Sequence, residues 1–175
     1  MYHSCSVSRH KCFLISLLNT RNLPLRIQHI VVDHALMESS ILCFQEIRTN
    51  MQFGDNILSD SYYFLSMHHL HGICTCYRNN IFLDTFYHYN STSIESIVVD
   101  FQLQVFPLRV ANVYIAPCAS IIEILQYVTT ILQNAKQTYY TIFARDFNID
   151  MSRSNHSYET LLSFMHNNNF NFYMT

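Results

Sequence analysis

The stretch Cys12–Glu46, CFLISLLNTRNLPLRIQHIVVDHALMESSILCFQE, contains two apolar runs on either side of a segment with helical spacing. Residues 12–18 are apolar except for Ser16, which is typical of a buried strand, and residues 40–46 form a second run that ends in Gln-Glu. Between them, apolar residues recur at roughly helical intervals over residues 24–37, so we expect a helix there. A strand, a helix and a strand in this order predict a βαβ unit, or at least an α/β layer.

Strands and helices are expected to the end of the chain. Stretches rich in β-branched and aromatic residues predict strands at residues 62–67, 73–78, 94–103 and 108–115. Amphipathic spacing predicts helices over residues 118–137 and 157–165, and apolar runs predict further strands at 138–143 and 170–175. We therefore expect one α/β domain with a strand-rich middle between helical flanks.

Length and composition limit the class of protein. The 175 residues are 50% hydrophobic and 13% charged, which suffices for one compact core and excludes a disordered acidic or basic tail. The net charge of −2 gives no overall basic bias, so any contact with nucleic acid would have to come from a local surface. No stretch approaches the length of a membrane span, so we expect no membrane partner. The six cysteines follow no secretory signal, which predicts free thiols in an intracellular compartment.

Polar residues follow three of the expected strands. Asn19 and Glu46 end the first two strands, and Asp146 with Asn148 ends a later one. Open α/β sheets place ligand sites outside the carboxyl ends of their strands. A carboxylate there with no nearby lysine suits Mg²⁺, and a second carboxylate beside an amide can orient a water nucleophile and hold a phosphate oxygen. From spacing alone, Asp-x-Asn is equally consistent with an ordinary Asx turn.

Four segments together resemble the endonuclease/exonuclease/phosphatase superfamily, and within it the AP-endonuclease-like domains of retroelements. They are residues 17–21 with Asn19, residues 41–46 ending in Gln-Glu, residues 112–117 with the pattern Asn-x-Tyr-x-x-Pro, and residues 141–148, which are similar to a strand ending in Gly-Asp-Phe-Asn. His71-Gly72-Ile73 also resembles the family's Gly-Gly-Val strand start. The resemblance implies a four-layered α/β sandwich, in which two mixed β-sheets lie face to face with helices outside.

The same resemblance implies a role for each candidate residue. Glu46 would bind a catalytic Mg²⁺ or Mn²⁺ ion, with Asn19 supporting the metal or the phosphate. Tyr114 would lie against the scissile phosphate. Asp146 would position or deprotonate the attacking water, and Asn148 would hydrogen-bond the phosphate. The implied function is that of a metal-dependent phosphodiesterase, a hydrolase that resembles a DNA endonuclease domain of a mobile element, with an intracellular or nuclear location and DNA as its partner.

Two departures from the family pattern keep a second hypothesis open. Arg145 stands where the family has a glycine before the catalytic Asp, and Arg lacks the backbone freedom of Gly, although it could add positive charge near a phosphate. The family's later Ser-Asp-His motif has no counterpart before Thr175. We therefore expect residues 12–175 to be a partial domain, incomplete at the C-terminus, after an N-terminal extension at 1–11. The alternative function is a catalytically inactive, truncated remnant or binding module, of undetermined oligomeric state, with an open sheet edge that favours association.

A cluster of histidines and cysteines raises the question of zinc. His68, His69, His71, Cys74 and Cys76 lie close together in the sequence. No second Cys/His pair follows at a spacing usual for structural zinc. Cys74 and Cys76 would share one face of an expected strand, as core residues do. We therefore expect Cys74 and Cys76 to be core residues, and we do not expect this cluster to bind zinc.

Overall fold

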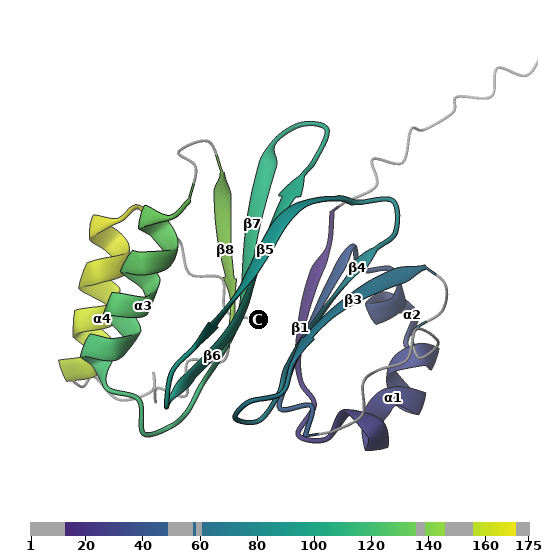
Figure 1. The fold of residues 1–175 in the computed structure, drawn as a ribbon, viewed down its shortest axis with the longest axis horizontal. Helices are drawn as coiled ribbons and strands as arrows, with labels where there is room; N and C mark the ends of the chain where they lie inside the picture. Colours follow the sequence, from purple (N-terminus) through teal and green to yellow (C-terminus); the bar gives the residue numbers. More distant parts are fainter. Residues whose placement is uncertain (1–12, 49–57, 59–60, 136–138, 146–155, 171–175) are drawn as a thin grey trace, which may run out of the picture.

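Two mixed β-sheets stand face to face at the centre of the molecule, with helices on both outer faces (Figure 1). The computed structural model describes residues 13–48, 58, 61–135, 139–145 and 156–170. Within these residues each sheet has four strands, in the order β1-β2-β4-β3 in the first sheet and β5-β6-β7-β8 in the second. This arrangement confirms the expected α/β sandwich of two mixed sheets flanked by helices.

The first sheet is built on a parallel βαβ unit. Its strands are β1 (Ile15–Asn19), β2 (Ile41–Gln45), β3 (Tyr62–Met67) and β4 (Ile73–Arg78). β1 and β2 pair in parallel, and β4 pairs antiparallel with both β2 and β3. Every residue of β2 is buried, which explains why its first four residues are apolar. The predicted strand–helix–strand order is therefore confirmed. The expectation of a buried first strand was wrong, because β1 is the edge strand of the described sheet and is only partly buried, with Leu17 39% exposed.

The helical connection consists of two helices where one was expected. α1 (Leu23–Val32) is followed by α2 (His34–Met37), and Asp33 lies between them with an extended backbone. The Asp33 carboxylate accepts hydrogen bonds from the backbone N–H groups of Ala35 and Leu36, at 3.0 and 3.1 Å. An aspartate that caps a new helix interrupts the preceding one, so the prediction of a single helix over residues 24–37 was wrong at this position.

The second sheet follows in the chain. Its strands are β5 (Phe82–Asn90), β6 (Ile94–Gln102), β7 (Pro107–Ile115) and β8 (Tyr140–Ala144). β8 pairs in parallel with β7, and α3 (Ile121–Gln133) and α4 (His156–Asn167) lie on the outer face (Figure 1). The sequence did not predict β5, because this strand at the sheet edge is mostly exposed and carries polar residues among its aromatic ones. Of the strand expected at residues 170–175, all but Phe170 lies outside the described residues.

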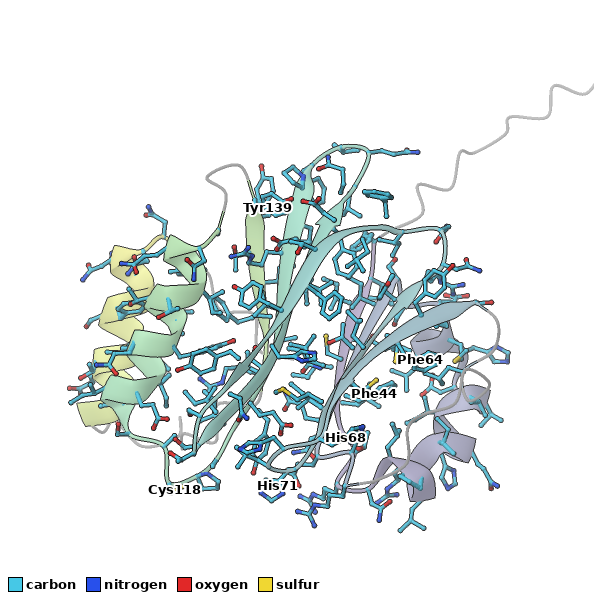
Figure 2. All side chains as sticks on the ribbon, viewed as in Figure 1. Phe44, Phe64, His68, His71, Cys118 and Tyr139 are labelled. Carbon is cyan, nitrogen blue, oxygen red and sulfur yellow. The ribbon has the colours of Figure 1, made fainter. Side chains whose placement is uncertain are left out.

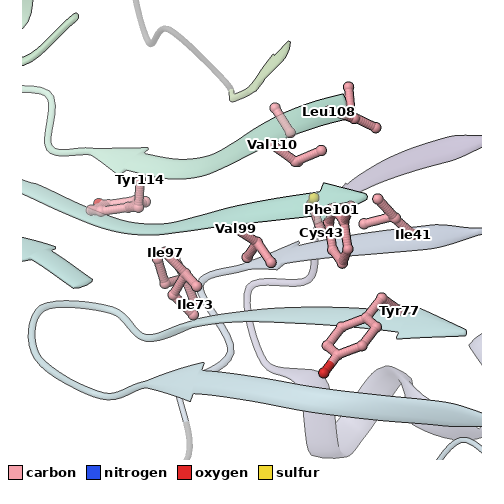
Figure 3. Packing of buried hydrophobic residues seen from close by; sticks show 11 residues of the cluster. Ile41, Cys43, Ile73, Tyr77, Ile97, Val99, Phe101, Leu108, Val110 and Tyr114 are labelled. Atoms are coloured by element: carbon pink, nitrogen blue, oxygen red, sulfur yellow. The ribbon is translucent and has the colours of Figure 1, made fainter. Parts of the chain in front are cut away.

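Three apolar clusters hold the four layers together. The central cluster lies between the sheets and includes Cys43, Tyr77 and Phe101 (Figure 3). A second cluster joins the first sheet to α1, and a third joins the second sheet to α3. Cys74 and Cys76 belong to the second cluster, with their sulfur atoms 3.6 Å apart, as expected for core residues. None of the helices among the described residues has the length and apolar character needed to cross a bilayer.

Candidate active site

The ends of strands from both sheets meet at one end of the sandwich. Asn19 is the last residue of β1 and is paired with Gln45, the last residue of β2, which in turn is paired with Ile73, the first residue of β4. The side chain of Gln45 contacts Val113 near the end of β7 and Ala144 at the end of β8. His71 and Cys118 lie at this end of the molecule, opposite Tyr139, which directly precedes β8 (Figure 2). The residues after these strands form the candidate site.

Asn19 and Glu46 are in direct contact. The Asn19 Nδ2 atom donates a hydrogen bond of 2.8 Å to Glu46 Oε1, and Asn19 Oδ1 accepts one from the backbone N–H of Arg21 at 3.2 Å. The second carboxylate oxygen of Glu46 forms an ion pair with Arg48 Nη2 at 2.8 Å. The side chain of Glu46 is 15% exposed, whereas that of Arg48 is 52% exposed. The structure thus brings together the two residues that the sequence placed at the ends of the first two strands.

The backbone around Glu46 has an unusual conformation. Glu46 and Arg48 have φ values of 52° and 47°, in the left-handed region that favours glycine. A non-glycine residue there costs about 1–3 kcal/mol and persists only where its surroundings hold it in place. Thr20 Oγ1 donates hydrogen bonds to the carbonyl oxygens of Gln45 and Glu46, at 3.0 and 3.3 Å. Such strain at a sheet end is typical of functional sites.

Gly72, just before β4, contacts the residue that follows Glu46. Its carbonyl oxygen accepts a hydrogen bond from the backbone N–H of Ile47 at 3.0 Å, and its φ is 78°. A Cβ atom at Gly72 would lie 2.6 Å from Ile47 Cγ1, so both the backbone angle and the close approach require glycine. The carboxylate of Glu95 on β6 accepts hydrogen bonds from the backbone N–H groups of His69, His71 and Gly72, at 2.9, 3.3 and 3.1 Å.

Tyr114 lies on β7, beside His71 in the segment between β3 and β4. Its side chain is almost buried, at 4% exposure, and its ring lies against that of His71 with a centroid distance of 4.8 Å. Burial raises the pKa of the Tyr114 hydroxyl, and the negative charge of Glu46 raises it further. A phenol with a raised pKa stays protonated at neutral pH, so Tyr114 can donate a hydrogen bond to an anionic group.

The remaining predicted residues are Asp146 and Asn148, and both lie outside the described residues. Arg145, which precedes them in place of the family's glycine, is 8% exposed at the end of β8. The sequence interpretation did not identify Gln45, Glu95 or His71 as parts of the site. Glu95 carried one signal, because it is a charged residue in the apolar run of β6.

The side chains around Glu46 decide whether a metal ion could bind there. Among the residues that the structure describes, no group of three or more His, Cys, Asp or Glu side chains is arranged to hold a metal ion. Mg²⁺ is commonly held by only one or two carboxylates, with water and substrate phosphates completing its shell. The single carboxylate of Glu46 fits that mode, provided that the exposed Arg48 side chain turns away from Oε2.

No protein-family model matches this chain, and no curated protein matches its sequence. Solved structures do resemble it. An endonuclease/exonuclease/phosphatase family protein from Leptotrichia buccalis has a TM-score of 0.68 and 15% identity, over 87% of this chain and 73% of that one. The endonuclease domain of TRAS1, a telomere-specific non-LTR retrotransposon, has a TM-score of 0.64 and 10% identity, over 89% of this chain and 71% of that one.

TDP2 from D. rerio, solved with a single-strand DNA product, has a TM-score of 0.64 and 15% identity, over 90% of this chain. This chain spans 65% of the length of that TDP2 structure. At these identities the similarity establishes the fold. The chain therefore has the fold of the endonuclease/exonuclease/phosphatase superfamily, as the four sequence segments predicted.

Proposed function

We propose that this chain is a metal-dependent phosphodiesterase domain, a DNA endonuclease-like hydrolase derived from a mobile element. The observation that carries the proposal is the Glu46 carboxylate, which Asn19 holds at the meeting point of the strand ends. The fold supports it, because proteins with this fold include an endonuclease domain of a retrotransposon and a protein solved with a DNA product.

The described side chains suit in-line hydrolysis of a phosphodiester. Tyr114 can donate its hydroxyl proton in a hydrogen bond to a non-bridging phosphoryl oxygen, where negative charge develops in the transition state. Arg48 is 52% exposed at its side chain, and its guanidinium could exchange the carboxylate of Glu46 for a phosphate group. We assign Asp146 to hold the attacking water and accept its proton, and Asn148 to donate a hydrogen bond to the phosphate.

Glu46 would hold Mg²⁺ or Mn²⁺, with Asn19 fixing the orientation of the carboxylate through Oε1. A bound divalent cation supplies Lewis-acid polarisation of the phosphoryl group and neutralises developing negative charge. The Asn19 amide leaves one lone pair of Oε1 and the whole of Oε2 available once Arg48 turns away.

A nucleic-acid substrate fits the surface beside Asn19. An open groove of about 490 Å³ runs between the end of β1 and α1, and Arg21, Arg26 and His29 line it together with Asp33. Arg21 and Arg26 are exposed, so they can approach phosphate groups that flank the scissile one. This groove is a local basic surface of the kind that a chain with a net charge of −2 needs to bind DNA.

The test is cleavage of DNA by the purified protein. Supercoiled plasmid and a duplex with an abasic site are incubated with Mg²⁺, Mn²⁺ or EDTA, using wild type, Glu46→Gln and Asp146→Asn. The matched control is Glu38→Gln, an exposed carboxylate at the end of α2. We expect cleavage by wild type and the control only in the presence of metal, and a loss of at least about 100-fold in both site variants. Equal cleavage by all four proteins would point to a contaminating nuclease and overturn the proposal.

A second candidate function is a binding module without hydrolytic activity. Two observations favour it: Arg48 pairs with Glu46 Oε2, and within the described residues β1 and β8 each have a neighbouring strand on one side alone. Leu17 on β1 and Ile142 on β8 are 39% and 40% exposed. DNA binding by wild type, measured by fluorescence anisotropy, without cleavage in either metal would select this function over the first.

A further inference from the structure

The side-chain amide of Gln45 crosses from the first sheet to the second. Gln45 is 1% exposed, and its Nε2 atom lies 2.6 Å from the carbonyl oxygen of Val113, 3.2 Å from that of Ala144 and 3.4 Å from Asn112 Oδ1. All three acceptors belong to β7 or β8, on the opposite sheet. A primary amide has two N–H donors, so these acceptors satisfy both of them.

The side chain of Asn112 on β7 donates hydrogen bonds in the opposite direction, to the first sheet. It is fully buried, and its Nδ2 atom donates to Thr75 Oγ1 at 3.2 Å and to the carbonyl oxygens of Phe44 and Cys74 at 3.3 and 3.0 Å. These acceptors lie on β2 and β4 of the first sheet. The two amides therefore connect the sheets in both directions, inside a layer that is otherwise apolar. Unpaired amides there would be costly, so the network is specific to this one arrangement of the sheets.

The atoms that Gln45 joins stand next to the candidate site residues. Gln45 directly precedes Glu46, Val113 directly precedes Tyr114, and Ala144 lies two positions before Asp146. The carbonyl oxygen of Gln45 also accepts hydrogen bonds from Thr20, from the backbone N–H at 2.9 Å and from Oγ1 at 3.0 Å. One residue thus fixes the ends of β1, β2, β7 and β8 relative to one another.

We propose that Gln45 is a positioning residue of the candidate site, whose buried amide sets the separation between Glu46 on one sheet and Tyr114 on the other. The expected effect on catalysis rests on the proposed function. Glu46 has a left-handed φ of 52°, a conformation that needs surrounding contacts to persist. An apolar side chain of the same length would fill the space of Gln45 and leave the facing carbonyl groups and Asn112 without their donor. A displacement of about 1 Å between reacting groups is sufficient to lower a rate by about 100-fold.

The test compares variants inside and outside this network. Gln45→Met removes the amide and keeps the length of the side chain, and Thr75→Val is a milder change that removes one acceptor of Asn112. The control is Tyr127→Phe, which deletes the buried 2.6 Å hydrogen bond from Tyr127 to Ser96 on the outer face of the second sheet. Amide hydrogen exchange is followed by NMR, and hydrolysis of a phosphodiester is followed with Mg²⁺.

We expect local effects in the network variants. Exchange at the amides of Ile47 and Arg48, which bond to the carbonyl oxygens of Gly72 and His71, should accelerate at least about 10-fold in Gln45→Met, with little change at the centre of β6. Thr75→Val should show the same pattern with a smaller change, and it keeps the test informative if Gln45→Met does not fold. Tyr127→Phe should leave these two amides unchanged. In Gln45→Met, kcat should fall about 100-fold with KM within about 2-fold.

The possible outcomes separate the two proposals. Uniform acceleration of exchange throughout Gln45→Met, or none at Ile47 and Arg48 in either network variant, would overturn the positioning role. Unchanged kcat in Gln45→Met with an active wild type would also overturn it, while the proposed hydrolase would stand. The expected exchange pattern together with an inactive wild type would support the structural part of the inference and refute the hydrolase.

Discussion

The amide of Asn19 donates a 2.8 Å hydrogen bond to the carboxylate of Glu46, although 27 positions separate the two residues in the chain. The parallel pairing of β1 and β2 produces this contact, because it aligns Asn19 with Gln45 and leaves Glu46 immediately beyond. The other carboxylate oxygen, Glu46 Oε2, forms an ion pair of 2.8 Å with the exposed side chain of Arg48. One oxygen of this carboxylate is therefore held by Asn19, and a ligand would reach the other only by displacing Arg48.

Replacing Asn19 should separate activity from stability. Asn19→Ala removes the donor to Glu46 Oε1 at an exposed position, so we expect a loss of about 1 kcal/mol or less in the free energy of unfolding and a loss of about 10-fold or more in phosphodiester hydrolysis. Asn22→Ala is the matched control, since Asn22 caps α1. It should cost about 1 kcal/mol with unchanged kcat. Urea unfolding and steady-state kinetics measure the two quantities, and equal kcat in both variants would contradict the role of Asn19.

Gly72 should not tolerate a side chain. Gly72→Ala combines a φ of 78° with a Cβ atom 2.6 Å from Ile47 Cγ1, and we expect a loss of roughly 2–4 kcal/mol in the free energy of unfolding. The control is Asn169→Gly, at a residue with a φ of 58°, where glycine relieves strain and stability should change by less than about 1 kcal/mol. Urea denaturation checks both values. A loss below about 1 kcal/mol in Gly72→Ala would show that the loop relaxes easily.

The buried ion pair between Arg109 and Asp100 should show strong coupling. Arg109 Nε and Nη2 each lie 2.7 Å from an oxygen of Asp100, and both side chains are almost fully buried. Arg109→Met alone leaves the Asp100 charge unpaired and should cost about 3–5 kcal/mol. The double variant with Asp100→Leu should recover most of that loss. A double-mutant cycle of urea unfolding measures the coupling, and additive effects of the two single substitutions would contradict it.

Alkaline pH should destabilise the fold through its buried thiols. Burial raises the pKa of Cys43 and of Cys76, so both remain protonated in the folded protein when the unfolded thiols ionise, above about pH 8.5. The unfolded state then binds fewer protons, and stability falls as pH rises, by about 1.4 kcal/mol per pH unit for each thiol. Cys43→Ala should reduce this slope between pH 9 and 10, whereas Cys118→Ala, at an exposed thiol, should not. Urea unfolding midpoints measured at several pH values give the slope of stability against pH. Identical slopes in both variants would refute the role of the buried thiol of Cys43.

The sequence predicted most of the fold because runs of apolar residues mark strands and helices, although the apolar edge strands β1 and β8 are partly exposed. β3 and β4 begin and end at the expected residues. The expected helix failed at Asp33, where one side chain caps a new helix against the apolar pattern. For the site, the motifs predicted that Asn19 and Glu46 would lie at strand ends, which is confirmed. Gln45 stood in the Gln-Glu pair of the second strand but was given no role, because the sequence does not show that its amide reaches β7 and β8. Glu95 belonged to none of the motifs. The catalytic roles of Asn19, Glu46, Tyr114, Asp146 and Asn148 all stay predictions.

The two sheets are sequential along the chain, the first within residues 15–78 and the second within 82–144. Each sheet can form from its own continuous segment, and the order of synthesis favours the first. The side chains of Gln45, Asn112 and Glu95 gain these partners only when the sheets dock. Until the two sheets dock, Glu46 and Tyr114 belong to separate folding units. We therefore expect a folding intermediate with only one sheet formed to lack the candidate site. Any hydrolytic activity would then come from molecules in which both sheets have docked.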